Sequence, residues 1–236
     1  MGAMVLALAG MGALVFGTQG ASAQQSPVVV ELYTSQGCSS CPPADRLLHK
    51  LSDRDDVIAL ALHVDYWDYI GWKDSFANPA FTHRQKAYAA AAKRRSVYTP
   101  QMIVNGQEDV VGTYAMEIAD LIMDHSTRRA PVDLSLQRGN STLEIRARWT
   151  RDQTPPPMVV QLVHYIPEET VHIRRGENAG ETLTYHNIVN GWQVLEQWDG
   201  TAPLSLRTPE DGDRPVVVLV QVEGHGPIVA AAQLRD

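Results

Sequence analysis

The spacing of hydrophobic positions changes near Ala130-Pro131 and divides the chain into two parts. Before this point, continuous apolar runs alternate with segments whose apolar residues recur every three or four positions, which predicts alternating strands and helices. The expected strands are 28–33, 57–64, 100–104 and 108–111, and the expected helices are 42–51, 78–95 and 114–125. The order β-α-β-α-β-β-α predicts an α/β domain over residues 26–128, built on a four-stranded sheet.

After Pro131, apolar and polar residues alternate, as at Val132, Leu134 and Leu136. A period of two is typical of strands that bury one face. About nine short runs of this kind follow, and turns rich in Gly, Pro and Asp separate them. The pattern predicts an all-β, sandwich-like domain over residues 131–236. The strands expected in its middle segment are 158–165, 170–174, 183–189 and 192–198.

Residues 1–23 have the pattern of an export signal peptide. The apolar run Met4–Phe16 is too short to span a bilayer comfortably, and it leads to Ala21-Ser22-Ala23, the small-x-small pattern that signal peptidase reads. No Lys or Arg precedes the run, so an uncleaved membrane anchor and a buried N-terminal helix remain as alternatives. We expect a mature protein that begins at Gln24, is periplasmic or secreted, and has no membrane attachment.

Composition narrows the classes of function. A chain with 44% hydrophobic and 20% charged residues is ordinary for a globular protein, which excludes a disordered chain. The net charge of −7 argues against a nucleic-acid partner, because phosphate binding needs a basic face. Cys38 and Cys41 are the only cysteines, so a disulfide-rich miniprotein is excluded as well.

The motif Cys38-Ser39-Ser40-Cys41 lies between the first expected strand and a helix that begins with Pro42-Pro43. A thiol at a helix N-terminus meets unpaired N–H groups and the positive end of the helix dipole, and both lower its pKa. We predict that Cys38 is the nucleophile, with its sulfur open to solvent. Cys41, one turn further on and shielded, would resolve the mixed disulfide. This chemistry is that of a thiol–disulfide oxidoreductase and needs no cofactor beyond the thiols.

Three other interpretations of the two cysteines remain open. A structural disulfide would close so short a loop that it stabilises weakly. A metal site, most simply for copper(I) or zinc, would combine both thiolates with His63 or another histidine. No second CxxC and no spaced histidine pair completes such a site, so no bound metal or cofactor is expected. A binding protein that keeps the fold without turnover is the third alternative.

The strand–CxxC–helix start, the element order and Thr99-Pro100 before the third strand resemble the thioredoxin-like fold. That resemblance implies a cis Thr99–Pro100 bond, with Pro100 facing the cysteine pair. Residues 28–112 are also similar to a family of exported bacterial thioredoxin-fold proteins of unknown function. The expected chemistry implies a protein or low-molecular-weight thiol or disulfide as partner, and the family resemblance adds no particular substrate. Ser-Ser, where thioredoxin itself has Gly-Pro, leaves the direction of electron flow open. The stretches that carry the family resemblance are 31–45, 63–68 and 174–178.

Three further segments have two interpretations each. Asp65, at the end of the second expected strand, either accepts a proton from Cys41 during exchange or caps the following turn. Tyr66–Trp72 holds four aromatic residues and forms either an apolar lip for a protein substrate or a loop that packs over its own core. Arg174–Gly180 is either a charged hairpin loop or a rim that reaches the cysteines. The histidines form no legible cluster; they include His49, His83, His164 and His186.

Overall fold

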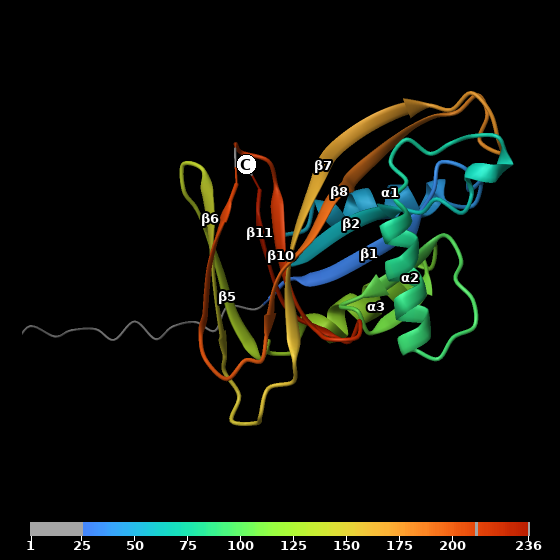
Figure 1. Ribbon diagram of the computed structural model, residues 1–236. Coiled ribbons are helices and arrows are strands. Elements are labelled where there is room, and N and C mark those ends of the chain that lie inside the picture. Colours follow the sequence, from blue (N-terminus) through green and yellow to red (C-terminus); the bar gives the residue numbers. More distant parts are fainter. Residues whose placement is uncertain (1–25, 211, 236) are drawn as a thin grey trace, which may run out of the picture.

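The protein is described here by a computed structural model that covers residues 26–210 and 212–235 (Figure 1). The expected signal peptide over residues 1–23 and the cleavage before Gln24 lie outside the described residues. The described residues form two sheets: a mixed sheet of eight strands and an antiparallel sheet of three. No helix within the described ranges is long and apolar enough to cross a membrane.

The first half follows the predicted order β-α-β-α-β-β-α, with one short 3-10 helix added. Helix α2 ends at Ala91, earlier than the predicted end near Arg95, because Lys93 adopts a left-handed conformation with φ 56°. The elements are β1 Val28–Thr34, α1 Pro42–Ser52, β2 Val57–His63, η1 Asp68–Ile70, α2 Pro79–Ala91, β3 Gln101–Val104, β4 Glu108–Val111 and α3 Ala115–Ser126.

The second half has fewer and longer strands than predicted. The segments 158–165 and 170–174 join into one strand, β7, and 183–189 and 192–198 join into β8. These two strands pair with each other along their length, and β-bulges absorb the changes of register, so polar residues between the predicted pieces stay in the ladder. The strands are β5 Val132–Arg138, β6 Thr142–Trp149, β7 Met158–His172, β8 Thr182–Trp198, β9 Leu204–Pro209, β10 Val216–Val222 and β11 Ile228–Leu234.

The large sheet crosses the boundary expected near residue 130. Its strand order is β11-β10-β7-β8-β2-β1-β3-β4, and β8 joins β2 in parallel at Ala61 and Ile188. The side-chain amide of Asn187 also donates to the carbonyl of Ala59, at 2.9 Å. The expectation of a four-stranded sheet is therefore corrected, because those four strands are one half of an eight-stranded sheet.

Strands β1 and β2 are buried on both faces, as their continuous apolar sequences predict. On β1, Val30 and Leu32 pack in a core with α1 and α3, whereas Val29 and Tyr33 pack in a core with α2. This two-sided burial fixes the end of β1, and so the position of the loop that follows it and carries Cys38.

The three-stranded sheet packs against the β7, β10 and β11 part of the large sheet. Val216, Val218 and Val220 of β10 contribute to this second, sandwich-like core. Val217 and Leu219, on the other face of β10, belong to the core that contains α2. The part of the chain from β5 to β11 is all-β, and it shares a core with the helical half.

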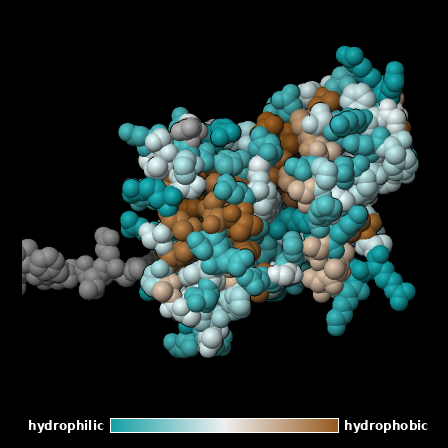
Figure 2. Space-filling model, viewed as in Figure 1, coloured by the Kyte–Doolittle hydropathy of each residue, from teal (hydrophilic) through white to brown (hydrophobic). Residues whose placement is uncertain are grey.

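A groove of about 990 Å³ lies between β11 and the three-stranded sheet. Figure 2 shows hydrophobic side chains gathered on this side, over the region where Figure 1 labels β11 and β5. Neither cysteine lines the groove, so it is separate from the site described below. Its lining includes the arginines Arg129, Arg146, Arg148 and Arg235.

A buried polar network joins the two halves. Glu31, the one charged residue of β1, is fully buried, and its carboxylate accepts a hydrogen bond from Nε of Arg84 on α2 at 2.7 Å. The guanidinium of Arg84 also donates to Gln221 of β10 at 3.1 Å and lies 4.0 Å from the ring centroid of Trp192 on β8. A charge placed in the centre of the sheet thus has partners from both halves of the chain.

Candidate functional site

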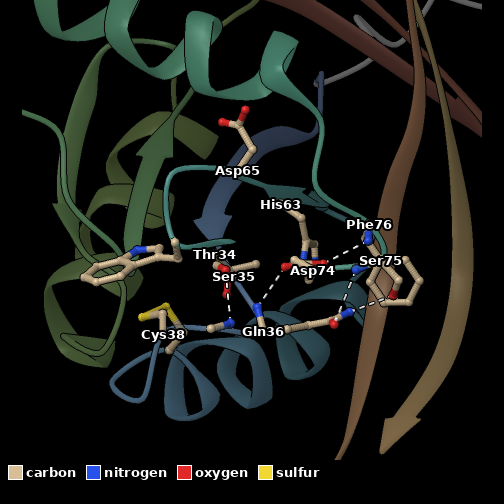
Figure 3. Close-up of polar contacts among 12 residues, drawn as sticks. Thr34, Ser35, Gln36, Cys38, His63, Asp65, Asp74, Ser75 and Phe76 are labelled. Carbon is tan, nitrogen blue, oxygen red and sulfur yellow. Dashed lines mark hydrogen bonds and ion pairs between the residues drawn. A yellow bond between two sulfur atoms is a disulfide. The ribbon is translucent and has the colours of Figure 1, made fainter. Parts of the chain in front are cut away.

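Cys38 and Cys41 form a disulfide in the turn between β1 and α1 (Figure 3). The S–S distance is 2.10 Å and the Cα–Cα distance is 5.4 Å. Cys41 is the N-cap residue of α1, and Pro42 and Pro43 occupy the first positions of the helix. Proline fits there because the first backbone N–H groups of a helix have no partner within it. The predicted placement of the pair at a helix N-terminus is confirmed.

Both cysteines are buried, with exposed fractions of 2% for Cys38 and 0% for Cys41. The expectation that the Cys38 sulfur is open to solvent is wrong. The neighbouring residues Ser39 and Ser40 are exposed, so the turn itself reaches the surface. The Ser40 hydroxyl lies 3.4 Å from the Cys38 sulfur, and further contacts come from segments far away in the sequence.

Thr99 is one of these distant contacts. Its hydroxyl donates to the Sγ of Cys38 at 3.3 Å and accepts a hydrogen bond from the indole Nε1 of Trp67 at 2.8 Å. The Thr99–Pro100 bond is cis, as predicted. Contact between Pro100 and the cysteines themselves stays a prediction.

Gly112 shows how tightly Pro100 packs against the helix that follows the cysteines. A Cβ atom on Gly112 would lie 3.0 Å from the Cβ of Ala44 and 3.1 Å from the Cβ of Pro100. Such contacts are tighter than most real Cβ contacts, so a neighbour would have to move by a few tenths of an ångström. The absent side chain of Gly112 therefore allows α1 and the Thr99–Pro100 segment to approach each other closely.

Residues Arg174–Gly180, which we call the hairpin tip, connect β7 to β8 and reach the cysteines. The side-chain amide of Asn178 donates to the carbonyl oxygens of Gln36 at 2.9 Å and Cys38 at 3.1 Å. The carboxylate of Glu177 accepts a hydrogen bond from the backbone N–H of Ser39 at 3.3 Å. In Figure 1 the β7–β8 hairpin arches over to the loops that follow β1 and β2. Of the two interpretations left by the sequence, a rim at the cysteines is the one the contacts support.

Asp65 contacts Thr82 and not Cys41, the partner considered from the sequence. Its carboxylate accepts a hydrogen bond from the hydroxyl of Thr82 on α2 at 2.5 Å. Figure 3 shows this carboxylate pointing away from Cys38. The structure therefore gives Asp65 a contact that holds α2 to the end of β2, and none of its recorded contacts involves a cysteine.

Tyr66–Trp72, which we call the aromatic segment, packs over its own core at one end and exposes the ring of Tyr69. Tyr66 and Trp67 are partly buried and pack against the core beneath α2. Tyr69, in η1, is 79% exposed, and its ring stacks near that of Trp67 with centroids 6.5 Å apart. A role as a lip for a protein substrate stays a prediction.

His63 and Asp74 form a buried pair beneath the loop that carries Cys38 (Figure 3). The Nδ1 of His63 lies 2.8 Å from Oδ2 of Asp74, and the same carboxylate accepts the backbone N–H groups of Gln36 and Phe76, each at 2.8 Å. Burial opposes ionisation of Asp74. His63 and these N–H groups outweigh it, so the pKa of Asp74 lies below its ordinary value. Nothing in the sequence around Asp74 indicates this partner.

Asp45 is an acidic group that sequence reasoning did not select. It lies one helical turn after Cys41, and its backbone N–H donates to the Cys41 carbonyl at 3.1 Å. Its buried carboxylate accepts a hydrogen bond from the hydroxyl of Thr34 at 2.8 Å. Burial raises the pKa of Asp45 to about 6, although His63 and Thr34 partly offset the effect. The spacing of four residues from Cys41 is the signal that predicts its position, because residues i and i+4 share a helix face.

The histidines do not form a metal site with the cysteines. The Nδ1 of His63 is engaged by Asp74, and the rings of His49 and His186 stack with centroids 3.6 Å apart. Within residues 26–210 and 212–235, no group of three or more His, Cys, Asp or Glu side chains is arranged to hold a metal ion. The ligand set considered from the sequence is not assembled in this part of the chain.

These observations define a mixed α/β protein whose disulfide lies at a helix N-terminus beneath a hairpin from its β-rich half. Residues 29–221 match the family model described as "Protein of unknown function (DUF1223)", and the chain belongs to this family. The chain is also similar to a protein from Agrobacterium tumefaciens of known crystal structure. The two sequences are 33% identical, the match covers 90% of this chain and 96% of that one, and the TM-score is 0.77. No curated protein matches the sequence.

Proposed function

We propose that this protein is an exported thiol–disulfide oxidoreductase that acts through Cys38 and Cys41. The observation that carries the proposal is the pairing of the two sulfurs at the N-terminus of α1, with the Thr99 hydroxyl donating to the Cys38 sulfur. A disulfide also suits the oxidising compartments to which an exported protein is sent.

We further propose that the first half has a thioredoxin-like fold. In its support, β1 and β2 are parallel, β3 is antiparallel to β1, and the order of these strands within the sheet is β2-β1-β3-β4. Helices α1 and α3 pack with one face of β1, and α2 packs with the other. This arrangement resembles the minimal form of that fold, with the cysteines at the position of its reactive pair.

The exchange proceeds in two displacements. A substrate thiolate attacks the Cys38 sulfur, a bond forms between these two sulfurs, and Cys41 leaves as a thiolate. A second substrate thiolate then attacks the substrate sulfur of the mixed disulfide, and Cys38 leaves. The substrate pair loses two electrons and becomes a disulfide, and the protein gains them as two thiols. The reverse sequence reduces a substrate disulfide.

The surroundings of Cys38 favour its thiolate. Its place before α1 puts the sulfur near the positive end of the helix dipole, and the Thr99 hydroxyl donates a hydrogen bond to it. Both effects favour the Cys38 thiolate in the reduced protein, against the burial of the sulfur. We therefore retain Cys38 as the nucleophile, with Cys41 as the resolving residue.

Asp45 replaces Asp65 as the proposed proton acceptor for Cys41. It shares a helix face with Cys41 and is buried, and its pKa of about 6 allows it to bind or release a proton close to neutral pH. When Cys41 leaves as a thiolate, protonated Asp45 returns the proton. When Cys41 attacks a mixed disulfide, the Asp45 carboxylate takes the proton up.

Reduction of insulin by dithiothreitol tests the proposal. We expect the wild-type protein to accelerate the reaction, and we expect Cys38→Ser and Cys41→Ser to abolish the acceleration. Cys41→Ser should in addition retain substrate as a mixed disulfide on Cys38, seen by intact mass. Ser52→Ala, at the other end of α1, is the control that keeps both cysteines. Wild-type turnover no faster than the uncatalysed reaction, in protein whose Cys38 and Cys41 are shown by intact mass to be reduced, would refute the proposal. Copper(I) retained under reducing conditions would favour metal handling instead.

A further inference from the structure

The hairpin tip is hydrogen-bonded to the loop that carries the buried disulfide on which the proposed function depends. We propose that the tip makes exchange selective for polypeptides that bind the adjoining aromatic segment, and protects the disulfide from small free thiols. This inference rests on the proposed function and names its substrate class. Asn178 and Glu177 are the residues that determine this specificity.

The geometry of exchange makes burial decisive. An attacking thiolate must approach the target sulfur in line with the S–S bond, so that the other sulfur can leave. Cys38 is 2% exposed and Cys41 0% exposed, so neither sulfur offers solvent an approach of that kind. Exchange therefore requires a displacement of what covers Cys38.

The hairpin tip is held by a small number of polar contacts. Asn178 is buried, and its amide holds two carbonyl oxygens of the cysteine loop. The exposed Glu177 adds one longer hydrogen bond to Ser39. Gly176 and Gly180 have φ values of +82° and +91°, a backbone conformation that favours glycine. Displacing the tip breaks the Asn178 and Glu177 contacts and leaves the β7–β8 ladder intact.

The aromatic segment adjoins both the tip and the reactive sulfur. A Cβ atom on Gly176 would lie 3.2 Å from the Cβ of Trp72, so the tip rests directly on this segment. At its other end, Trp67 donates to Thr99, which in turn donates to the Cys38 sulfur. Between Trp67 and Trp72 in the sequence, Tyr69 is exposed, and its ring lies near that of Trp67. A polypeptide chain laid across Tyr69 therefore meets the tip on one side and Thr99 on the other.

The difference in binding free energy between the closed and open states explains why a polypeptide would react faster than a small thiol. A ligand shifts a conformational equilibrium only by its difference in affinity for the two states. A small thiol makes few contacts with either state, so it reacts only in the open fraction. An apolar polypeptide buries surface against the aromatic segment and against the face that the displaced tip exposes, so it favours the open state.

The test compares two thiols of matched chemistry: N-acetylcysteine amide and a short apolar peptide with a single cysteine. The second-order rate constant for mixed-disulfide formation is measured with each probe. For the wild-type protein, we expect the peptide to react about tenfold faster. Asn178→Ala removes two hydrogen bonds, and we expect the small thiol to gain about tenfold while the peptide gains less. Glu177→Gln should produce a smaller change of the same sign, and Glu181→Gln, an exposed residue beside the tip, should produce none.

Hydrogen exchange supplies a measurement that does not depend on any variant folding. In the wild-type protein, we expect the backbone amides of 174–180 and the amide of Ser39 to exchange faster when a serine analogue of the peptide is bound. Equal rates for the two probes, or an unchanged small-thiol rate in folded Asn178→Ala, would overturn the inference alone. Absence of reaction with both probes in wild-type and Asn178→Ala proteins would overturn the proposed function and this inference together.

Discussion

The two halves of the chain differ in how deeply their polar and charged side chains are buried. In residues 28–126, strands β1 and β2 are buried throughout, and the Glu31–Arg84 ion pair and the hydrogen-bonded pair His63–Asp74 lie in the interior. In residues 132–234, strand β5 begins with the buried Val132 and then alternates between exposed and half-buried positions, and Arg148–Asp133 is an exposed pair. The first half therefore holds most of the buried acidic, basic and histidine side chains, and Glu210, which contacts His164, is the exception in the second half.

The comparison also shows that the halves depend on each other. Gln221 and Trp192 of the second half complete the surroundings of Arg84, and Asn178 completes those of Cys38. A buried polar group needs partners, and here several of those partners come from more than a hundred residues away. The β-rich half thus contributes to the candidate site through cover and through hydrogen bonds.

The largest expected effect is the loss of stability when the buried Glu31–Arg84 ion pair is broken, compared with the loss at the exposed Asp133–Arg148 pair. Arg84→Met leaves the Glu31 carboxylate buried without its cation, so we expect a loss of about 3–5 kcal/mol in the free energy of unfolding, measured with urea. Arg148→Met, at the exposed pair with Asp133, should cost less than about 1 kcal/mol.

A double variant sharpens this result. Glu31→Leu combined with Arg84→Met removes both charges, so most of the lost stability should return. A loss of similar size for Arg84→Met and Arg148→Met would show that the interior pair is not what joins the halves.

The second prediction concerns the pH dependence of stability. Folding raises the pKa of Asp45 from 3.8 to about 6, so the stability associated with its protonated form is complete below pH 3.8 and is lost as the pH rises through about 6. Relative to Asp45→Asn, the wild-type protein should lose up to about 3 kcal/mol across this interval, measured by unfolding at several pH values.

The same variant tests the role of Asp45 in exchange. Near neutral pH we expect Asp45→Asn to slow resolution of the mixed disulfide by about a hundredfold, the lower end of general acid–base effects. Asp65→Asn, the matched carboxylate bound to Thr82, should leave the pH profile of this step unchanged. The opposite pattern in the two variants would restore Asp65 as the proton acceptor.

The third prediction addresses the close approach of α1 to the Thr99–Pro100 segment. Gly112→Ala places a methyl group against Ala44 and Pro100, so we expect a loss of about 1–3 kcal/mol in thermal or urea unfolding. The shift should also weaken the Thr99 contact with Cys38 and slow insulin reduction. Unchanged stability in this variant would mean that the two segments separate without cost.

The smallest expected effect is that of Trp67→Phe. The substitution keeps an aromatic ring and removes the indole N–H that bonds Thr99, so we expect a loss of about 1 kcal/mol in unfolding free energy. The Thr99 hydroxyl then has one partner fewer to orient it toward Cys38. We expect a small rise in the pKa of the Cys38 thiol. The pKa is measured from the pH dependence of iodoacetamide alkylation in reduced Cys41→Ser protein, with and without Trp67→Phe. A fall in this pKa would contradict the assigned geometry.

Local features of the sequence determined the elements of the first half and the position of the cysteines. The apolar runs of β1 and β2, the helical spacing after Pro42 and the Asn105-Gly106 turn act within a few residues, so they predict strands, helix and hairpin directly. The cis Thr99–Pro100 bond came from the family resemblance and was confirmed.

Tertiary structure alone decided what surrounds the disulfide. Asn178 lies 140 residues beyond Cys38, and its place depends on β7 and β8 pairing along their length and on β8 joining β2. The periodicity of apolar residues does not predict which strand edge another strand will join, because strand pairing depends on packing across the whole sheet. The pKa of Asp45 likewise depends on burial beneath distant segments. Sequence periodicity therefore placed the sulfurs, and long-range pairing determined their exposure and their neighbours.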